Sequence, residues 1–329
     1  MNHNPDHKIN RRQFITRSAK AGISILAAGS IGYWFYDGAG PDRPSTGSTA
    51  PQMPDFSMPR LGRRMSIVRG SSRSETLELA LKSIGGMEAF IKAGDRVLLK
   101  VNAAFASPPM LSATTHPEIV SVITRLCFKA GAQSVVVTDN PINDPASCFR
   151  LTGIEQAALS AGASVVLPQN ELFKPYSLPG AQLIRNWPVL YKPLQAVNKV
   201  IGTAPVKDHH RSGASMIMKN WYGLLGGRRN IFHQDIHTII KELALMVKPT
   251  LVVLDGTFSM LRNGPTGGSL SDLKQTHTMI VATDQVAADA FGATLLGKTI
   301  EELAFIQKAE AGGAGTADFQ SLNPVMESI

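Results

Sequence analysis

The chain has 329 residues, of which 43% are hydrophobic and 18% are charged, and its formal net charge is +8. This length suffices for one large domain or two medium ones with a buried core, and a mean hydropathy of 0.00 excludes both a disordered chain and a polytopic membrane protein. Two cysteines are too few for a disulfide framework or a site of four thiolates, so no iron–sulfur cluster is expected in this chain.

The positive charge is spread along the chain. Five basic residues against two acidic ones give residues 1–40 a charge of +3, residues 41–60 are neutral, and residues 61–329 carry the remaining +5. A mildly basic body without a clustered patch favours small anions and is a weak footprint for nucleic acid. We therefore expect a small anionic ligand as a partner, and no nucleic acid.

The N-terminus has the pattern of an export signal. A basic stretch, Asn10–Thr16, contains Arg11 and Arg12 and precedes an apolar run from Ala21 to Tyr36. The stretch resembles the twin-arginine signal, which implies passage of the folded protein through the twin-arginine (Tat) translocase and a periplasmic location. The alternative is an ordinary signal or anchor that contains two arginines.

The signal segment lacks a clean cleavage site, so both a cleaved signal and an uncleaved anchor stay open. The nearest small-residue sites, at Gly38–Gly40 and Ser48–Ala50, are each followed by a proline that hinders cleavage. An uncleaved N-terminus would tether the protein to the inner membrane. Residues 1–36 are thus predicted to be signal or anchor, residues 37–60 a Pro-rich unstructured linker, and residues 61–329 the folded domain.

From residue 61 onward, short apolar runs alternate with helical patterns, which is typical of an α/β fold with a parallel sheet. Several runs are apolar throughout, so helices are expected on both faces of a mostly parallel sheet. The Pro-rich stretch Leu172–Pro193 does not fit this alternation and is predicted to be a hairpin or insertion. The predicted strands are Ser66–Arg69, Arg96–Val101, Ser134–Thr138, Ser164–Leu167, Lys199–Thr203, Leu251–Leu254 and Met279–Ala282. The predicted helices are Ser74–Ile84, Pro117–Lys129, Gly153–Ser160, Ala214–Leu225, Gln234–Val247, Gln285–Leu296 and Thr299–Ala311.

Polar side chains follow five of the predicted strands. The carboxyl ends of parallel strands meet at one edge of a sheet, where ligands bind. These polar residues are Lys100 and Asn102, Asp139, Lys207 and His209, Asp255, and Asp284. We expect them to form one cleft. For Asp284 the alternative is that it caps the helix that follows.

The segment between Val206 and His237 contains four of the eight histidines. If residues 232–238 are helical, His233 and His237 lie four residues apart on one face, as the paired imidazole ligands of a transition metal do. The alternative is that His233 caps a turn and His237 is solvated. A transition metal is therefore one expected cofactor.

Two lysines of the same segment suggest anion binding. Lys207 follows a strand, and Lys219 with Asn220 lies towards the end of the next predicted helix. Lysines that converge on a strand end suit a phosphate or carboxylate, and a lysine whose pKa is lowered by burial also serves as a general base or a Schiff-base nucleophile. The glycine-rich loop that begins at Asn263 and Gly264 lacks P-loop spacing but allows backbone N–H groups to approach an anion.

Seven short motifs in sequence order resemble the domain-of-unknown-function 362 family, over roughly residues 95–297. They are Lys100-Val101-Asn102 with Thr115-His116-Pro117-Glu118, Lys207-Asp208-His209, Lys219-Asn220-Trp221-Tyr222-Gly223, His233, Asp255-Gly256, Asn263-Gly264-Pro265, and Thr283-Asp284-Gln285-Val286-Ala287-Ala288-Asp289. The resemblance implies an α/β fold and an association with ferredoxin modules and redox operons. The ferredoxin-type cysteine run of many relatives is absent from this chain.

These observations predict an exported, redox-associated enzyme that binds an anionic small molecule, metal or cofactor, with a redox protein as a further partner. The alternative is a non-catalytic ligand- or partner-binding module of a periplasmic redox system. The candidate catalytic residues are His116, Lys207 and His209, with the choice between His209 and His210 open. The candidate ligand-binding residues are Lys100, Asn102, Asp139, Lys219, Asn220, Asp255, Asn263, Gly264 and Asp284.

The predicted export signal can be tested by mutation. Replacing Arg11 and Arg12 by lysine should retain the protein in the cytoplasm, because a twin-arginine signal is read through its arginine pair. Fractionation of a bacterium with a functional twin-arginine pathway measures the exported fraction. The double variant Lys8→Arg/Lys20→Arg is the matched control, and equal export of both variants would show that an ordinary signal operates.

Overall fold

The computed structural model describes residues 11, 12, 16 and 51–329. The predicted signal, apart from three residues, and most of the predicted linker lie outside the described residues. Residues 51–60, however, belong to the compact domain. Phe56 is buried, and its backbone bonds to Lys248 and to the hydroxyl of Thr250. The expectation of an unstructured linker therefore does not hold for residues 51–60.

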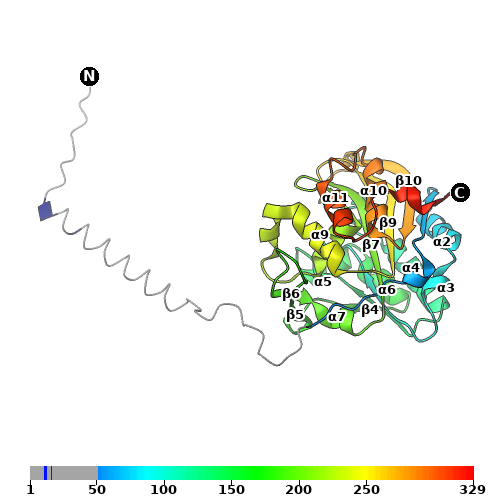
Figure 1. Ribbon diagram of the computed structural model, residues 1–329, viewed down its shortest axis with the longest axis horizontal. Coiled ribbons are helices and arrows are strands. Elements are labelled where there is room, and N and C mark those ends of the chain that lie inside the picture. Colours follow the sequence, from blue (N-terminus) through cyan, green and yellow to red (C-terminus); the bar gives the residue numbers. More distant parts are fainter. Residues whose placement is uncertain (1–10, 13–15, 17–50) are drawn as a thin grey trace, which may run out of the picture. The chain divides into compact units, whose positions relative to one another are not determined.

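A mixed β-sheet lies at the centre of the domain (Figure 1). Within residues 51–329 the strand order is β11-β1-β10-β9-β7-β2-β3-β4, and β8 pairs with β7. The strands are β1 (Met65–Arg69), β2 (Arg96–Lys100), β3 (Ser134–Thr138), β4 (Ser164–Val166), β7 (Lys199–His209), β8 (Gly213–Ser215), β9 (Leu251–Met260), β10 (Leu273–Ala282) and β11 (Val325–Ser328). Along this order only β10 runs antiparallel to its neighbours, so the mostly parallel sheet is confirmed.

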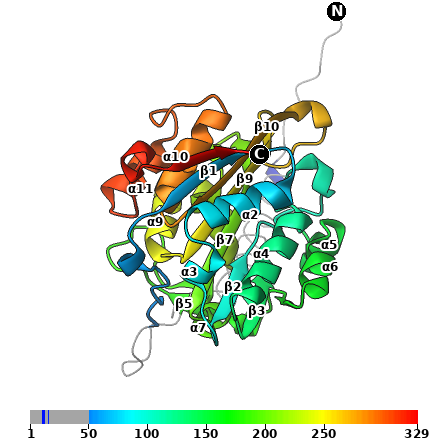
Figure 2. The same cartoon turned by 90° about the vertical axis from the view of Figure 1, so that its right-hand side faces the viewer.

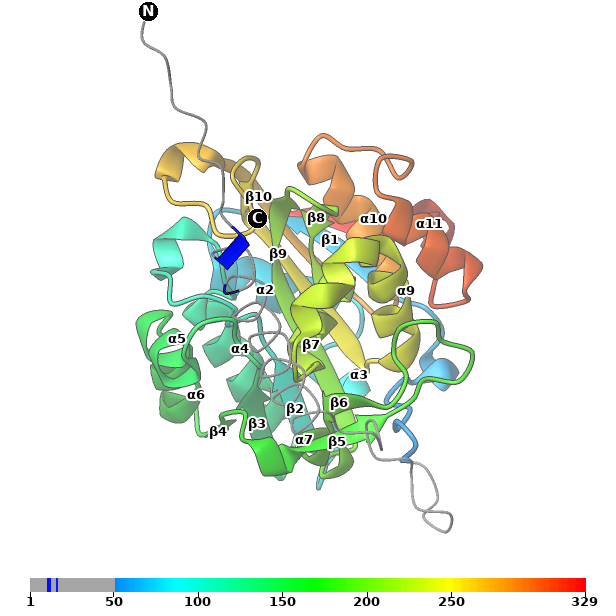
Figure 3. The ribbon, with the colours of Figure 1, turned by 90° about the vertical axis from the view of Figure 1, so that its left-hand side faces the viewer.

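Helices cover both faces of the sheet, as predicted. Figure 2 shows α2, α3 and α4 on one side, and Figure 3 shows α9, α10 and α11 on the other. Successive strand residues enter different cores: Leu98 packs with α9 and α10, whereas Val97 and Leu99 pack with α2 and α4. The helices are α2 (Arg73–Ser83), α3 (Met87–Phe90), α4 (Pro117–Lys129), α5 (Pro145–Leu151), α6 (Ile154–Ser160), α7 (Tyr191–Gln195), α8 (Ile217–Asn220), α9 (Ile236–Met246), α10 (Gln285–Leu295) and α11 (Ala304–Ala311).

The structure corrects the predicted helix Ala214–Leu225. β7 continues to His209 instead of ending at Thr203, and the chain returns as β8. Gly213, with a φ of +76°, begins β8 in a backbone conformation that favours glycine. Only α8 and the 3₁₀ turn Trp221–Leu224 are then left of the predicted helix. This extension places the last residues of β7 inside the sheet edge rather than in a loop.

The Pro-rich insertion is a hairpin, as predicted, formed by β5 (Phe173–Tyr176) and β6 (Trp187–Leu190). A single carboxylate on α9 holds the connection between these strands. Glu242 is fully buried and accepts hydrogen bonds from the backbone N–H groups of residues 182, 183 and 184, at 2.6–3.2 Å. The hairpin is therefore fixed to the helical layer by a charge-assisted contact.

None of the helices in the described residues has the length and apolar character needed to cross a membrane. Both cysteines, Cys127 and Cys148, are buried and free.

Replacing Glu242 by alanine should lower the free energy of unfolding by at least about 3 kcal/mol, because three backbone N–H groups lose a charged acceptor. Urea denaturation measures the change. The exposed Glu78 on α2 offers the matched control, and Glu78→Ala should change stability by less than about 0.5 kcal/mol. Equal losses in the two variants would contradict the role of Glu242.

Candidate functional site

A cavity of about 1310 Å³ opens at the sheet edge where β2, β3 and β7 end. Its other walls come from α8, the segment 221–233 and the loop after β9. Nine of the predicted site residues line it: Asn102, Asp139, Lys207, His209, Lys219, Asn220, His233, Asn263 and Gly264. Parallel strands thus bring residues that are far apart in the sequence to one edge.

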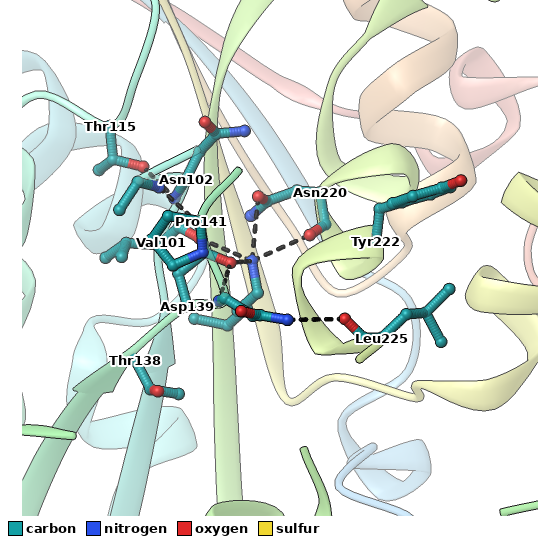
Figure 4. A network of polar contacts seen from close by, with 12 residues as sticks. Val101, Asn102, Thr115, Thr138, Asp139, Pro141, Asn220, Tyr222 and Leu225 are labelled. Carbon is teal, nitrogen blue, oxygen red and sulfur yellow. Dashed lines mark hydrogen bonds and ion pairs between the residues drawn. The ribbon is translucent and has the colours of Figure 1, made fainter. Parts of the chain in front are cut away.

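Lys100 lies beneath the cavity floor, with a side chain that is fully buried. Its ammonium is 2.7 Å from Oδ1 of Asp139 and donates to the backbone carbonyls of Val101 and Asn220 and to Oδ1 of Asn220. Figure 4 shows Asp139 and Asn220 in this network, together with the backbone at Val101. Burial lowers the pKa of Lys100, and the Asp139 carboxylate opposes that shift. Lys100 therefore holds the ends of two strands and α8 together rather than facing a ligand.

Both oxygens of the Asp139 carboxylate accept hydrogen bonds from within the protein. Oδ2 accepts from the N–H of Ala103, and Oδ1 accepts from the N–H of Asn140 in addition to Lys100. Gly223 passes so close that a Cβ at this position would lie 1.8 Å from Oδ1 of Asp139. A residue without a side chain is therefore required where the 3₁₀ turn crosses the ion pair.

Lys207 and Lys219 are the two amines that reach the cavity. Lys207 is 1% exposed, and its ammonium donates to the carbonyl of Ala113 at 2.5 Å and lies 5.4 Å from the ring of Phe105. Lys219 is half-buried and lies over the ring of Tyr222 at 5.4 Å. Among the described residues, neither lysine has a carboxylate within ion-pair distance. The cavity thus has a surplus of positive charge.

Burial and a neighbouring positive charge lower the pKa of both amines. Desolvation, followed by the charge of Lys219, lowers the pKa of Lys207 to about 7. Desolvation, followed by the charge of Arg229, lowers the pKa of Lys219 to about 8. An anion bound between the two amines would relieve this repulsion.

His209 presents a hydrogen-bond donor. Its Nδ1 accepts from the backbone N–H groups of Arg211 and Ser212, at 3.1 and 3.2 Å, so the proton of the neutral ring is on Nε2. Burial, followed by the charge of Lys219, lowers the pKa of His209 to about 2, and the ring stays neutral at physiological pH. His209 is therefore suited to donate to a ligand through Nε2–H, not to exchange protons. His210, which is exposed, stacks on it at 4.8 Å.

His233 has the opposite arrangement of protons. The hydroxyl of Tyr222 donates to the carbonyl of Arg229, so its oxygen accepts from Nδ1 of His233, at 3.2 Å. Nδ1 also faces the carbonyl of Asn230. The unprotonated nitrogen is then Nε2, and burial, followed by the charge of Lys219, lowers the pKa of this ring. Nε2 of His233 can thus accept a hydrogen bond in the cavity, which His210 also lines.

The structure does not bring His233 and His237 together as metal ligands. Residues 229–235 form a 3₁₀ segment, and α9 begins only at Ile236, so the two histidines do not share one face of a helix. His237 is not part of the cavity lining, and its ring stacks on Phe305 of α11. Across the described residues, no three histidine, cysteine, aspartate or glutamate side chains gather as a metal site requires. The residues present do not fit the predicted metal.

Asp284 lies at the opposite edge of the sheet. Because β10 is antiparallel, its carboxyl end points away from the ends of β7 and β9, and the expectation of a shared cleft is wrong here. Asp284 instead caps α10, where it accepts from the N–H groups of Val286 and Ala287. It lines a separate, smaller cavity of about 360 Å³. The capping alternative describes this residue correctly.

His116 and Asp255 also lie outside the cavity lining. His116 caps α4, with its Nδ1 accepting from the N–H of Glu118. Asp255 lies within β9, which continues to Met260, and pairs with Arg73 at 2.9 Å. Burial, followed by the charge of Arg73, lowers the pKa of His116. These two residues form a polar group of their own beside α2 and α4.

Three features of the site were not predicted from the sequence. Arg229 lines the cavity and binds four carbonyls, those of Asn140, Pro141, Tyr222 and Leu225, at 2.7–3.1 Å. Asn102, only 6% exposed, has an Oδ1 atom without a hydrogen-bond partner in the structure. Tyr222 orients His233. The Gly226-Gly227 pair before Arg228 and Arg229 was the one signal that a close turn with a basic residue lies here.

The glycine-rich loop after β9 forms one rim of the cavity, and the approach of its backbone N–H groups to an anion stays a prediction. Asn263 donates to the Asp272 carboxylate at 2.7 Å, which holds the loop. A Cβ on Gly264 would lie 1.9 Å from the carbonyl oxygen of Asp208, so the loop packs directly on the backbone of β7. The glycine thus serves a close approach between two segments of the protein.

Comparisons with known proteins identify similar sequences and folds. The model of the family described as "Domain of unknown function (DUF362)" matches residues 97–294, which confirms the resemblance seen in the motifs. The thylakoid-associated protein sll1697 of Synechocystis sp. is 27% identical over 222 residues, or 65% of this chain and 67% of that protein. The lactate racemase apoprotein of Thermoanaerobacterium thermosaccharolyticum shares 13% identity with a TM-score of 0.34, over 60% of this chain and 52% of that one. At this level the structural likeness supports no inference about function.

Replacing Lys100 tests whether the buried ion pair with Asp139 stabilises the site. Lys100→Met leaves the Asp139 carboxylate buried without its counter-ion, and we expect the free energy of unfolding to fall by about 3–5 kcal/mol. The double variant Lys100→Met/Asp139→Asn should recover part of this loss, because it removes the orphaned charge as well. Urea denaturation measures both. A double variant no more stable than the single one would contradict the ion-pair account.

Proposed function

The chain belongs to the DUF362 family, and we propose that its domain is an enzyme that binds and transforms a small anionic molecule in the cavity. The observation that carries this proposal is the pair of amines, Lys207 and Lys219, that face the cavity without a carboxylate partner. Buried cations are normally paired, so two of them at one cavity favour an external anion. A phosphate or a carboxylate has the required charge.

The other polar groups of the cavity support the same ligand class. Nε2–H of His209 and the two ammonium groups are donors, which an anionic oxygen accepts. Oδ1 of Asn102 is a buried acceptor without a donor, so the ligand is expected to carry a hydroxyl or amide donor as well. Apolar side chains such as Phe105, Ile142 and Phe173 line the rest of the wall. The favoured ligand therefore has an anionic group and a partly apolar body.

An enzyme is favoured over a binding module by an amine that exchanges its proton near neutral pH, beside a histidine nitrogen that can accept a hydrogen bond. The pKa of Lys207 is lowered to about 7, and His233 offers an unprotonated Nε2. The binding module has its own support, since the neutral His209 acts only as a donor. Stabilisation by a ligand that remains chemically unchanged, followed by NMR of the mixture, would favour the binding module.

Export and a redox role are further proposals for the whole chain. Export through the twin-arginine translocase, a periplasmic location and a tether to the inner membrane are supported by the Arg11-Arg12 segment and the apolar run after it. A redox partner protein is supported by the associations of the family. Both proposals concern where the enzyme acts and with whom, and the cavity chemistry is independent of them.

Anion binding should weaken as the pH rises through about 8, because the pKa of Lys219 is lowered to about 8 and its ammonium is lost above that pH. Sulfate and oxalate are suitable probes, since their charge is constant in this range. We expect the affinity measured by calorimetry to fall about tenfold for each pH unit above 8. At pH 7, Lys219→Met should weaken binding at least about tenfold.

The exposed Lys129 on α4 offers the matched control, and Lys129→Met should bind both probes as the wild type does. Binding that is unchanged by pH and by Lys219→Met would overturn the proposed anion site. Loss of binding in both lysine variants would point to a non-specific effect of net charge.

A further inference from the structure

The two amines of the cavity differ in environment, and this difference suggests a covalent step. We propose that Lys207 forms an imine with an aldehyde or ketone carbonyl of the anionic ligand, while Lys219 holds the anionic group. The substrate class is thus an anionic carbonyl compound. This inference rests on the proposed function, because it assumes that an anion binds beside Lys219.

Lys207 is the amine that can lose its proton at low cost. It is 1% exposed, and within residues 51–329 its nitrogen donates a hydrogen bond only to the carbonyl of Ala113, which accepts equally well from a neutral amine. Lys100, by contrast, has the Asp139 carboxylate at 2.7 Å, which keeps it charged and engaged. A buried amine without a counter-ion is more stable in the neutral, nucleophilic form.

Lys219 is the amine that keeps its charge. Its pKa is lowered to about 8, which is less than the shift of Lys207, and the ring of Tyr222, whose face attracts a cation, lies 5.4 Å from its nitrogen. Its charge is also the second cause, after burial, that lowers the pKa of Lys207. One ammonium beside a second amine is a known way of activating the latter as a nucleophile. The pair thus divides into a cation that binds and an amine that reacts.

His209 is placed to assist the same step. Residues two apart on a strand point to the same side, so His209 and Lys207 leave β7 on one face. The Nε2–H of His209 is the donor on that face, and a carbonyl oxygen that gains negative charge during attack accepts such a donor. His209 is accordingly an electrophilic helper and not the acid or base of the step.

The step balances without an added oxidant or reductant. The neutral nitrogen of Lys207 attacks the carbonyl carbon, a C–N bond forms as the C=O double bond becomes a single bond, and the oxygen takes up a proton while the nitrogen releases one. The resulting carbinolamine loses its hydroxyl as water, with one proton supplied to the oxygen and one released from nitrogen. The product is a C=N bond and one water molecule. Solvent water supplies the protons to the oxygen, and Nε2 of His233 can receive a proton released from nitrogen.

Reductive trapping of the full-length protein tests this inference. The probe is pyridoxal 5′-phosphate, which carries both an aldehyde and a phosphate, and pyridoxal without phosphate is its uncharged counterpart. After limiting exposure and reduction with cyanoborohydride, peptide mapping by mass spectrometry locates the adduct. We expect Lys207 to be labelled at least about tenfold faster than the exposed Lys129, and sulfate to slow this labelling.

Variants and pH separate a specific site from general lysine reactivity. Lys207→Arg should remove the main adduct, Lys219→Met should slow labelling by the phosphate-bearing probe more than by pyridoxal, and Lys129→Arg should change neither. In the wild type, labelling of Lys207 should rise through about pH 7 and then level off. Exposed lysines should continue to gain reactivity towards about pH 10.

The outcomes distinguish this inference from the proposed function. If sulfate binds as expected but Lys207 is labelled no faster than Lys129, the imine step is overturned and the anion site stands. If neither sulfate nor oxalate binds, both proposals fail. A levelling of the Lys207 profile near pH 7 in the wild type supports the imine step even where Lys207→Arg does not fold.

Discussion

The ion pair between Lys100 and Asp139, buried where two neighbouring parallel strands end, is the interaction on which the site depends. Each partner alone would be an uncompensated charge in the interior, so the two strand ends and the segment that covers them must stay in register. The ammonium also binds the carbonyl and side chain of Asn220, which fixes α8, and Gly223 has no side chain because the pair passes beneath it. The floor of the cavity thus rests on a buried ion pair and the hydrogen bonds that its ammonium donates.

The same ion pair explains the charge of the cavity. The carboxylate of Asp139 is occupied by Lys100 and by two backbone N–H groups, and it offsets only part of the effects that lower the pKa of Lys207. Lys207, Lys219 and Arg229 then contribute positive charge to one lining, with the guanidinium bound to carbonyl oxygens that carry no net charge. Because this carboxylate is bound by Lys100 at the cavity floor, a counter-charge for the lysines is left to a ligand. His209 adds a hydrogen-bond donor, its Nε2–H, and His233 adds a hydrogen-bond acceptor, its Nε2.

The reversed strand β10 divides the sheet into a part that builds the site and a part that does not. The ends of β2, β3 and β7 meet at the cavity because these strands are parallel. The end of β10 points to the opposite edge, where Asp284 caps α10 and lines a smaller cavity. The family match over residues 97–294 spans both parts, so the polar residues it contains serve two different ends of the sheet. Position in a motif alone does not place a residue at the site.

The sequence by itself determined the α/β class, the two-faced sheet, the hairpin nature of the Pro-rich insertion, and the concentration of polar residues after apolar strands. These features follow from local patterns, since burial on both faces selects apolar runs and strand ends select polar residues. Only the tertiary structure decided that Lys100 lies under the floor, that Asp284 lies at the far edge and that Arg229 joins the cavity. The direction of a strand and the partner of a buried charge are set by contacts between distant segments. Neither is encoded in a local periodicity or in the spacing of a motif, so neither can be predicted from the sequence pattern.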